Sequence, residues 1–370
     1  MIETHTAAVL ETVGQPLVLK TLPIPQARTG SAVIRVLTIA LSPNTKANLT
    51  GNFGIPPLNT PFIPGFSAIG RVHSVGQDAT RLQPGQLIWH DFCTWSRDDP
   101  DESILAGFMG GNQRLEEMWN NNTFANYAEV PLERVWSLDE DLLCRKMGYS
   151  FVDLSYLGVV GIAMAGLLDM DVHAGDSVIV APATGTYGGA AVPAALSLGA
   201  KVIACGRNAG TLARMTDVFG ASGRFETVVL TGEVDKDTSA IKTAIGGGGK
   251  GADCYIDFIP PRAAGTTHIL SCLGALRNRG RASFMGAIFS NVEIPYFLVM
   301  TKSIRIQGRY MFEREHGDRS IKLLEAGCLV VGNRPMSGMK MHVFKLEDIH
   351  HAVNTAAEIS GWGNMVVVEP

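Results

Sequence analysis

The sequence has little net charge and none of the closely spaced cysteine pairs that bind metals. With 31 Lys and Arg against 35 Asp and Glu, its formal net charge is -4, which leaves no basic surface for nucleic acid. The six cysteines form no Cys-x-x-Cys pair, so a four-thiolate zinc site is not expected and the thiols are predicted to be reduced. These absences argue against a nucleic-acid-binding protein and against a disulfide-stabilised secreted one.

Long hydrophobic runs are also missing. The longest apolar stretch, Leu157 to Leu168, is shorter than the ~20 residues that cross a bilayer, and we expect it to be a buried helix. The N-terminal residues show no basic segment followed by an apolar one, as a signal peptide would. The sequence therefore predicts a cytoplasmic protein without a membrane partner.

What the chain does contain is hydrophobic residues, at 46%, and 41 glycines spread among short apolar runs. Its 370 residues are too many for one compact core, so two domains are expected. Residues 1–152 alternate apolar and polar positions between Gly and Pro breaks, which predicts an antiparallel, barrel-like β domain. In residues 153–310 strand-length apolar runs alternate with helical stretches, which predicts an α/β domain with a parallel sheet.

Two further segments complete this division. Residues 311–370 return to a mixed pattern, and we expect them to pack back on the N-terminal domain. The stretch 94–123 has no clear period and many turn residues, so it is predicted to be a long functional loop.

The most informative segment runs from Val178 to Asn208. A buried strand leads into a Gly-x-Gly-x-x-Gly arrangement with alanine in the first place, and a helix follows directly. Small residues let the backbone approach a pyrophosphate, which the helix N-terminus holds with its free N–H groups. The predicted phosphate-binding turn consists of Ala183, Thr184, Gly185, Thr186, Tyr187 and Gly188. The alternative is a tight strand-to-helix turn without a ligand.

The end of the next strand indicates which cofactor is bound. An NAD site places Asp or Glu there to accept hydrogen bonds from the ribose 2′-OH, whereas this chain has Gly206, Arg207 and Asn208. A guanidinium binds a phosphate through two hydrogen bonds, and no carboxylate is present to repel it. NADP(H) is thus the expected cofactor; the alternative interpretation of Arg207 is an ordinary solvated loop residue.

Over nearly all of its length the chain resembles the medium-chain dehydrogenase/reductase superfamily. The resemblance is carried by "GFSAIGRVHSVG" with "RLQPGQLI", by "TFANYAEVP", by "HAGDSVIVAPATG", and by the later strands "GADCYIDFIP", "GRASFMG" and "SIRIQG". It implies a GroES-like β-barrel catalytic domain, completed by the C-terminus, and a Rossmann domain with a doubly wound parallel sheet. The nicotinamide would lie in the cleft between them, bordered by Ile259, Met285, Gly286 and Ala287.

The metal ligands of the zinc-dependent members do not carry over. Phe66 and Ser67 stand where such members have a His-Glu pair, and Ser42 stands where they have a ligand cysteine. No Cys or Asp lies between Leu154 and Leu168, where a third ligand would come. A catalytic zinc of this type is therefore not expected, and the protein is predicted to be zinc-independent.

Zinc-free members of the superfamily typically reduce an activated C=C bond, so the resemblance implies hydride transfer from NADPH to a small apolar enone, quinone or enoyl substrate. The developing enolate needs a hydrogen-bond donor or a proton source. The catalytic candidates near the expected cleft are Ser42, Asn44, Lys46, His90 and Tyr156. Three of them also have a structural interpretation, namely a surface lysine, a strand histidine and a core tyrosine. The candidates for the substrate pocket are Phe53, Phe66, Trp89 and Trp95.

Two other functions stay open. One is a zinc-independent, NADPH-dependent carbonyl or alcohol oxidoreductase, and the other is an NADPH-binding protein without turnover. The expected partner is a small-molecule substrate. The sequence leaves the oligomeric state open, and the resemblance is compatible with a homodimer or homotetramer because relatives are commonly dimers or tetramers. Residues 284–296 are the expected edge for such pairing.

Overall fold

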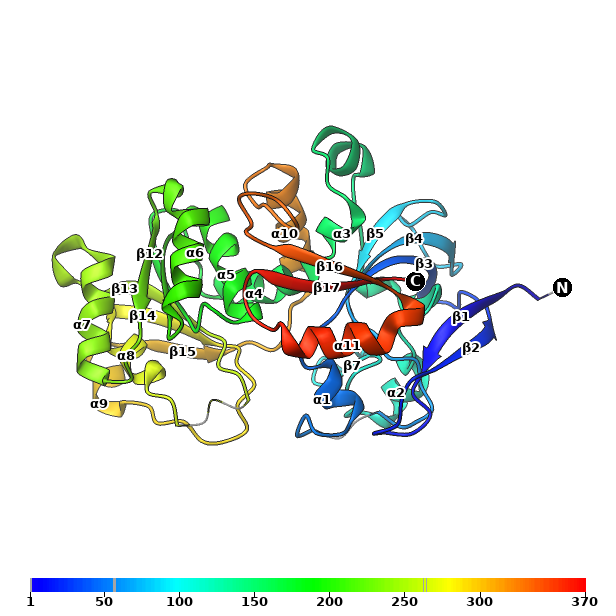
Figure 1. Cartoon of the computed structure of the whole chain (residues 1–370), viewed down its shortest axis with the longest axis horizontal. Helices are drawn as coiled ribbons and strands as arrows, with labels where there is room; N and C mark the ends of the chain where they lie inside the picture. Colours follow the sequence, from blue (N-terminus) through cyan, green and yellow to red (C-terminus); the bar gives the residue numbers. More distant parts are fainter. Residues whose placement is uncertain (1, 56–57, 262, 264) are drawn as a thin grey trace. The chain divides into compact units, whose positions relative to one another are not determined.

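The computed structural model describes residues 2–55, 58–261, 263 and 265–370, and it divides into two compact units. The first unit holds the residues up to Gly158 together with Lys340–Ser360 and Asn364–Pro370. The second holds Val159–Met339 and the short segment Gly361–Gly363. Figure 1 labels most of the helices and strands of both units.

The first unit is built on a seven-stranded sheet in the order β16-β17-β3-β4-β5-β9, with β8 also pairing with β3. All neighbours are antiparallel except β16 and β17, so the predicted antiparallel β domain is confirmed. Because β17 pairs with β3, the C-terminal residues return to this domain as expected. The strands are Ser31–Ala40 (β3), Ala68–Val75 (β4), Leu87–His90 (β5), Tyr127–Pro131 (β8), Val135–Ser137 (β9), Lys340–Lys345 (β16) and Asn364–Glu369 (β17).

Smaller elements complete the first unit. A two-stranded antiparallel sheet pairs β1 with β2. The first unit also contains short helices. One follows β3, one comes just before the second unit in the chain, and one lies between β16 and β17. These elements are Thr4–Val9 (β1), Val18–Pro23 (β2), Thr45–Leu49 (α1), Phe151–Leu154 (α3) and Ile349–Glu358 (α11).

The stretch 94–123 is not the irregular loop that its sequence predicts. It contains most of the β6–β7 hairpin, Cys93–Trp95 and Ser103–Leu105, and the helix α2, Gln113–Trp119. The side chain of Asn112 caps α2 by accepting a 3.0 Å hydrogen bond from the backbone N of Leu115. A small hydrophobic core within the stretch stabilises it. This core consists of four buried residues, too few to produce a recognisable period in the sequence: Ile104, Ala106, Leu115 and Trp119.

The second unit is built on a six-stranded sheet in the order β12-β11-β10-β13-β14-β15, and every pair in it is parallel. This is the predicted doubly wound Rossmann sheet. The strand order reverses between β10 and β13, and the carboxyl ends of strands at such a point form the usual ligand-binding crevice. The strands are Ser177–Ala181 (β10), Lys201–Gly206 (β11), Phe225–Val229 (β12), Ala252–Asp257 (β13), Leu276–Phe284 (β14) and Arg305–Gly308 (β15).

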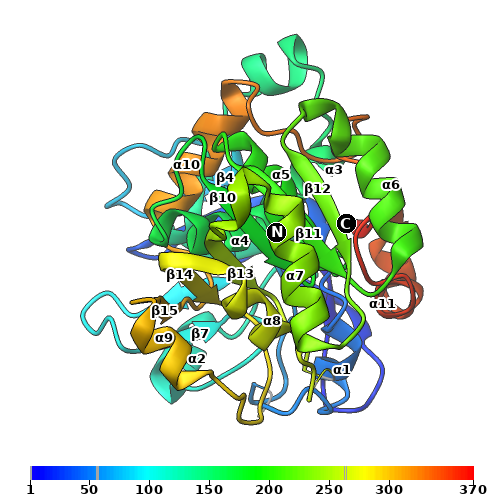
Figure 2. The ribbon, with the colours of Figure 1, turned by 90° about the vertical axis from the view of Figure 1, so that its left-hand side faces the viewer.

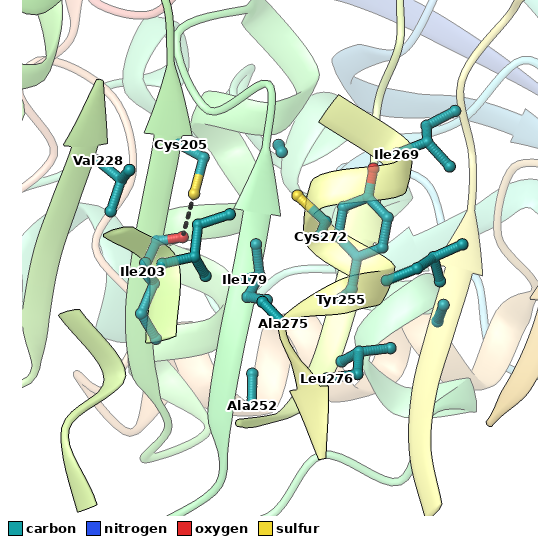
Figure 3. Close-up of a cluster of buried hydrophobic side chains, with 14 of the residues drawn as sticks. Ile179, Ile203, Cys205, Val228, Ala252, Tyr255, Ile269, Cys272, Ala275 and Leu276 are labelled. Carbon is teal, nitrogen blue, oxygen red and sulfur yellow. Dashed lines mark hydrogen bonds between the residues drawn. The ribbon is translucent and has the colours of Figure 1, made fainter. Parts of the chain in front are cut away.

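Helices cover both faces of this sheet. Figure 2 looks onto it from the side of α7, α8 and α9, which bury the hydrophobic cluster drawn in Figure 3. The helices α5 and α6 follow β10 and β11 by right-handed crossovers and cover the other face together with α4. The helices are Leu157–Asp169 (α4), Thr186–Ser197 (α5), Ala209–Phe219 (α6), Val234–Ile245 (α7), His268–Gly274 (α8), Tyr296–Thr301 (α9) and Arg314–Glu325 (α10).

The apolar run at 157–168 forms the helix α4, as predicted. Taken together with α3, the segment Phe151–Asp169 is long and apolar enough to cross a membrane, with a mean hydropathy of 1.9 over its window, but 78% of that window is buried inside the structure. A Cβ on Gly166 would lie 3.0 Å from Ile256 of β13, so α4 packs tightly against the sheet. These contacts are those of a core helix.

The segment 311–339 lies in the second unit, although its sequence pattern placed it with the first. The reason is a polar cluster at the end of α4. Asp169 accepts a 3.1 Å hydrogen bond from Nε2 of His316 on α10, and it pairs with Arg309 directly after β15. Arg309 also bonds Glu313 at 2.7 Å. These ionic contacts, which no local period reveals, anchor α10 to α4.

Candidate functional site

The predicted phosphate-binding turn joins β10 to α5. Its backbone is tied to the strands on both sides of β10, because the N of Ala183 donates to the carbonyl of Cys205 at 2.8 Å and the N of Phe258 donates to that of Ala181 at 3.2 Å. Gly185 is the N-cap of α5 and supplies no side-chain cap, and no acidic residue stands in the first helical turn. The first N–H groups of a helix have no acceptor inside the helix, so this end of α5 is suited to an anion.

The two glycines of the turn serve different purposes. A Cβ added to Gly188 would lie 2.0 Å from the carbonyl oxygen of Pro182, so only glycine lets α5 approach the end of β10. A Cβ added to Gly185 would meet nothing closer than that same oxygen at 3.8 Å. The space beside Gly185 is therefore open to a ligand, whereas the space beside Gly188 is filled by the protein.

The strand β11 ends without a carboxylate. After Gly206 the next acidic residue along the chain is Asp217, near the end of α6. Arg207 is exposed, whereas Asn208 is the N-cap of α6 and accepts a 2.9 Å hydrogen bond from the N of Thr211. The side-chain oxygen of Asn208 is therefore already used, whereas Arg207 places an exposed cation directly after the end of β11.

The four residues predicted to border the nicotinamide lie together in the second unit. The N of Met285 donates to the carbonyl of Asp257 at 3.1 Å, and the N of Ala287 donates to that of Ile259 at 3.0 Å. A Cβ on Gly286 would lie 2.7 Å from the backbone N of Ile259. The backbones that follow β13 and β14 are thus in direct contact, which gives a rigid surface at the carboxyl edge of the sheet.

Tyr187 links the turn to this surface. Its ring stacks on that of Phe258, with centroids 6.3 Å apart and planes 23° apart. Tyr187 is the second residue of α5, and Phe258 follows β13 directly. The stacking therefore fixes the position of the helix start relative to the nicotinamide-side residues.

Two of the catalytic candidates, His90 and Tyr156, are buried in the first unit. The ring nitrogens of His90 lie 3.1 Å from the carbonyl of Arg134 and 3.2 Å from Oδ1 of Asn122, and burial lowers its pKa to about 4. Burial also raises the pKa of the Tyr156 phenol, which makes it a weaker acid. These surroundings favour the structural interpretation of both residues.

The other three candidates lie on and just before α1. The Oγ of Ser42 accepts a 3.2 Å hydrogen bond from the backbone N of Asn44, and Ser42 is nearly buried. Asn44 is half-buried, and its side chain makes no cap bond to the helix. Lys46 is exposed. Of the polar side chains on this turn, those of Asn44 and Lys46 can therefore be reached by a small molecule.

One polar residue of α1 escaped the sequence interpretation. Nδ2 of Asn48 donates a 2.6 Å hydrogen bond to the carbonyl of Phe108, and the residue is buried. This bond holds α1 against the stretch 94–123. Its only signal in the sequence is an amide one helical turn after Asn44, which does not reveal a partner sixty residues away.

An aromatic cluster surrounds Phe66, where zinc-dependent members have their histidine. Its ring centroid lies 5.0 Å from that of Phe108, 5.2 Å from that of Phe92 and 6.0 Å from that of Phe124. Phe53 reaches the same cluster through Phe108, at 5.5 Å. Phe66 is itself buried, and the rings of Phe92, Phe108 and Phe124 pack around it.

The remaining pocket candidates, Trp89 and Trp95, differ in exposure. Trp89 is completely buried and stacks on Trp136, with centroids 4.8 Å apart, which favours a core role. Trp95 ends β6 and is half-buried. Of the four pocket candidates, Phe53 and Trp95 are therefore the two with a surface that a substrate could meet.

Comparison with known proteins places the chain in a family. The profile of the GroES-like domain of alcohol dehydrogenases matches residues 28–140, and that of the zinc-binding dehydrogenases matches residues 187–326. The chain belongs to the medium-chain dehydrogenase/reductase superfamily. Both units are thus accounted for, the first by the GroES-like domain and the second by the cofactor domain of this superfamily.

Individual members are similar over most of their length. An alcohol dehydrogenase of Rhizobium meliloti is 24% identical over 335 residues, which cover 88% of this chain and 89% of that protein. An L-arabinitol 4-dehydrogenase of Talaromyces emersonii is 25% identical over 313 residues, covering 79% and 72%. The solved structure of a zinc-binding dehydrogenase from Sinorhizobium meliloti 1021 bound to NADP superimposes with a TM-score of 0.75 at 18% identity, covering 100% of both chains. At that identity the likeness concerns the fold.

The positions at which zinc-dependent members of the superfamily carry ligands are part of the core here. Within the described ranges, no three His, Cys, Asp or Glu side chains gather as a metal site would require. Cys93, the one cysteine beside the stretch 94–123, is buried, which raises the pKa of its thiol to about 12. Independence from zinc nevertheless stays a prediction for experiment.

Proposed function

We propose that the protein is an NADP(H)-dependent oxidoreductase that transfers a hydride to an activated C=C bond without a catalytic zinc. The observation that carries this proposal is the open turn at Gly185, where α5 begins without a cap, followed by a strand end that lacks a carboxylate. Together they fit a dinucleotide whose ribose carries a 2′-phosphate.

The proposed binding mode uses residues of the second unit. The N-terminus of α5 and the turn at Gly185 would hold the pyrophosphate, and Arg207 would hold the 2′-phosphate through its guanidinium. The backbone of Ile259, Met285, Gly286 and Ala287 would border the nicotinamide. NADPH, when bound, supplies the hydride.

The proposed choice of substrate follows from Phe66 and Ser67. A carbonyl reductase of the zinc-dependent kind polarises the oxygen with its metal. In this chain the Phe66 side chain has no metal-binding atom, and the Ser67 hydroxyl is buried and hydrogen-bonded within the core. Neither position therefore supplies the histidine or carboxylate that a catalytic zinc needs. An activated alkene needs only a hydrogen-bond donor for the enolate oxygen and a proton for the α-carbon. Among the catalytic candidates, Lys46 and Asn44 are the accessible donors, and we assign that role to Lys46 because its cation stabilises the negative oxygen.

A second candidate is a carbonyl or alcohol oxidoreductase with the same cofactor. It is favoured by the names of the relatives, which are an alcohol dehydrogenase and an L-arabinitol 4-dehydrogenase. The product that the protein forms from an enone and NADPH distinguishes the two candidate functions. A saturated ketone supports the first proposal, and an allylic alcohol supports the second. Binding of NADPH without oxidation across a panel of enones, quinones and ketones would instead indicate a cofactor-binding protein without turnover.

The choice of cofactor is tested separately by isothermal titration calorimetry with NADPH and NADH. The proposal requires tighter binding of NADPH. If NADH binds at least as tightly, the assignment of Arg207 is wrong. We also propose that the protein acts in the cytoplasm as a homodimer or homotetramer.

A further inference from the structure

A buried carboxylate lies directly behind the residues proposed to border the nicotinamide. Asp257 ends β13, and its side chain is 2% exposed. It accepts three hydrogen bonds, from the Oη of Tyr255 at 2.8 Å, from Nε2 of His268 at 3.0 Å and from the backbone N of Ile259 at 3.1 Å. A buried carboxylate is tolerated when its oxygens are bonded in this way.

The two side chains that donate to Asp257 are themselves held in place. His268 is the first residue of α8, and its Nδ1 lies 2.8 Å from Oγ1 of Thr266. Tyr255 is fully buried in the hydrophobic cluster, where Figure 3 shows it beside Cys272 of α8. Burial and the neighbouring Asp257 raise the pKa of the phenol well above its usual value, so it remains a neutral donor. The two side-chain donors to Asp257 are therefore held rigidly on the side away from the proposed nicotinamide position.

Toward the proposed nicotinamide position, the hydrogen bonds of Asp257 end on the backbone of Ile259. Oδ2 of Asp257 accepts from the N of Ile259, while the carbonyl of Ile259 accepts from the N of Ala287 at 3.0 Å. Gly286 lies against Ile259 so closely that a Cβ would be 2.4 Å from its Cγ2. A displacement of the Asp257 carboxylate would thus move Ile259, and with it Gly286 and Ala287.

We propose that His268 and Tyr255 are positioning residues that act through Asp257 on the nicotinamide end of the cofactor site. The inference rests on the proposed NADP(H) binding and adds to it which buried side chains set the geometry of hydride transfer. The adenosine end would use the turn at Gly185 with Arg207 and Asn208, and the hydrogen bonds of the Asp257 side chain go to Tyr255, His268 and Ile259 and to none of these residues. The backbone bond and the ring stacking of Phe258 join the two ends, and neither uses the Asp257 carboxylate. The two ends of the cofactor should therefore respond differently to a change at His268.

This difference defines the experiment. The full-length protein and the variant His268→Leu are titrated calorimetrically with NADPH and with adenosine 2′,5′-bisphosphate, a fragment that lacks the nicotinamide. Leucine keeps the bulk of the side chain and removes the bond to the charged carboxylate. We expect NADPH binding to weaken at least about tenfold, because the Ile259 and Ala287 backbone is no longer held in place before the nicotinamide binds, and fragment binding to change less than about twofold. The variant His268→Gln, which keeps a donor, should recover much of the NADPH affinity.

A matched control comes from the same unit. His316 bonds Asp169 at 3.1 Å and is buried like His268, but Asp169 lies at the end of α4, and among the described residues its hydrogen bonds and ion pairs go to His316 and Arg309. His316→Leu should lower the thermal midpoint without separating the two ligands. If His268→Leu does not fold, Tyr255→Phe removes only a hydroxyl and tests the same network.

The outcomes separate this inference from the proposed function. Equal weakening of NADPH and the fragment, or unchanged NADPH affinity, overturns the positioning role while leaving NADP(H) binding intact. If the unaltered protein binds neither ligand, the proposed function fails and the inference fails with it. If it binds NADH in place of NADPH, the proposed cofactor is wrong, and the comparison is made with NADH and AMP, where the same selective loss supports the positioning role.

Discussion

The indole Nε1 of Trp89 donates a 2.6 Å hydrogen bond to the Oγ of Ser67, and both side chains are buried. The same Oγ donates to the carbonyl of His90 at 3.0 Å, and a Cβ on Gly158 would lie 2.4 Å from it. Ser67 stands where zinc-dependent members of the superfamily have a glutamate. In this chain the position joins two strands and a helix of the core, which leaves no room for a longer acid.

The first prediction concerns this contact. Ser67→Ala leaves the indole N–H of Trp89 buried without an acceptor, which costs about 1–3 kcal/mol of unfolding free energy. Urea unfolding followed by Trp fluorescence measures the loss. Ser222→Ala serves as the control, because Ser222 is exposed and should change the stability little. An unchanged midpoint for Ser67→Ala would mean that water or another group replaces the serine.

The two glycines of the phosphate turn make a matched pair for the second prediction. Gly188→Ala places a Cβ 2.0 Å from the carbonyl oxygen of Pro182, so we expect a protein that folds poorly or not at all. Gly185→Ala meets no atom closer than 3.8 Å and has a φ of -81°, which alanine adopts freely, so the fold should persist. Its NADPH affinity should nevertheless fall, because the methyl group occupies the space proposed for the pyrophosphate. Thermal unfolding and calorimetric titration report the two effects. Full NADPH affinity in Gly185→Ala would contradict the proposed site.

The third prediction concerns the 2′-phosphate. Arg207→Gln removes two charge-assisted hydrogen bonds and should weaken NADPH binding about 10- to 100-fold while leaving NADH binding nearly unchanged. Arg145→Gln is the control, since Arg145 is an exposed arginine of the first unit. A parallel loss of both cofactors in Arg207→Gln would assign the residue to folding instead.

The fourth prediction is a pH dependence of stability that originates at His90. Its pKa is about 4 in the folded protein and 6.5 when unfolded, so the unfolded chain takes up the proton first as the pH falls. Stability from this residue is therefore present above pH 6.5 and is lost toward pH 4. Between pH 7 and pH 5 the loss amounts to about 2 kcal/mol. Urea unfolding at the two pH values measures it, and the difference should shrink in His90→Asn. An equal difference in the variant would assign the effect to other groups.

The fifth prediction concerns pairing with a second copy. Tyr296 and Phe297 of α9 are 82% and 73% exposed, and β15 beside them is the edge strand of its sheet. An unpaired edge next to exposed aromatic rings favours association. Light scattering should find a dimer or tetramer, and Phe297→Asp should shift it toward the monomer. Val343→Asp, at an exposed position of the first unit, should not. A monomeric unaltered protein would remove this proposal.

Parts of the candidate site could be predicted from local pattern alone. The glycine turn from Ala183 to Gly188 is recognisable because a strand, small residues and a helix follow one another within one stretch of chain. The absence of a carboxylate after Gly206 is equally visible. Phe66 and Ser67 could be identified as replacements because the glycines around them keep their spacing. Each of these features depends on neighbours along the chain.

Other parts depend on residues that are distant in sequence. The hydrogen bond from Asn48 to the carbonyl of Phe108 and that from His316 to Asp169 join residues far apart in the chain, and neither follows from a period or a motif. His90 shows the converse error. Its residue type suggested a catalytic role, whereas its hydrogen bonds to Arg134 and Asn122 fix it in the core. Burial and pairing, which set whether a polar side chain is available, are properties of the folded chain.

By itself, therefore, the sequence determined the class of fold, the superfamily and the position of the glycine turn between β10 and α5, because hydrophobic period and glycine spacing act over a few residues. Only the tertiary structure decided which polar groups are accessible and which are structural. In the structure Lys46 is exposed and Ser67 accepts a hydrogen bond from the buried indole of Trp89. Tyr255 and His268 both bond the buried carboxylate of Asp257. The physical reason is that desolvation and hydrogen bonding between distant segments, rather than residue type, determine what a side chain can do.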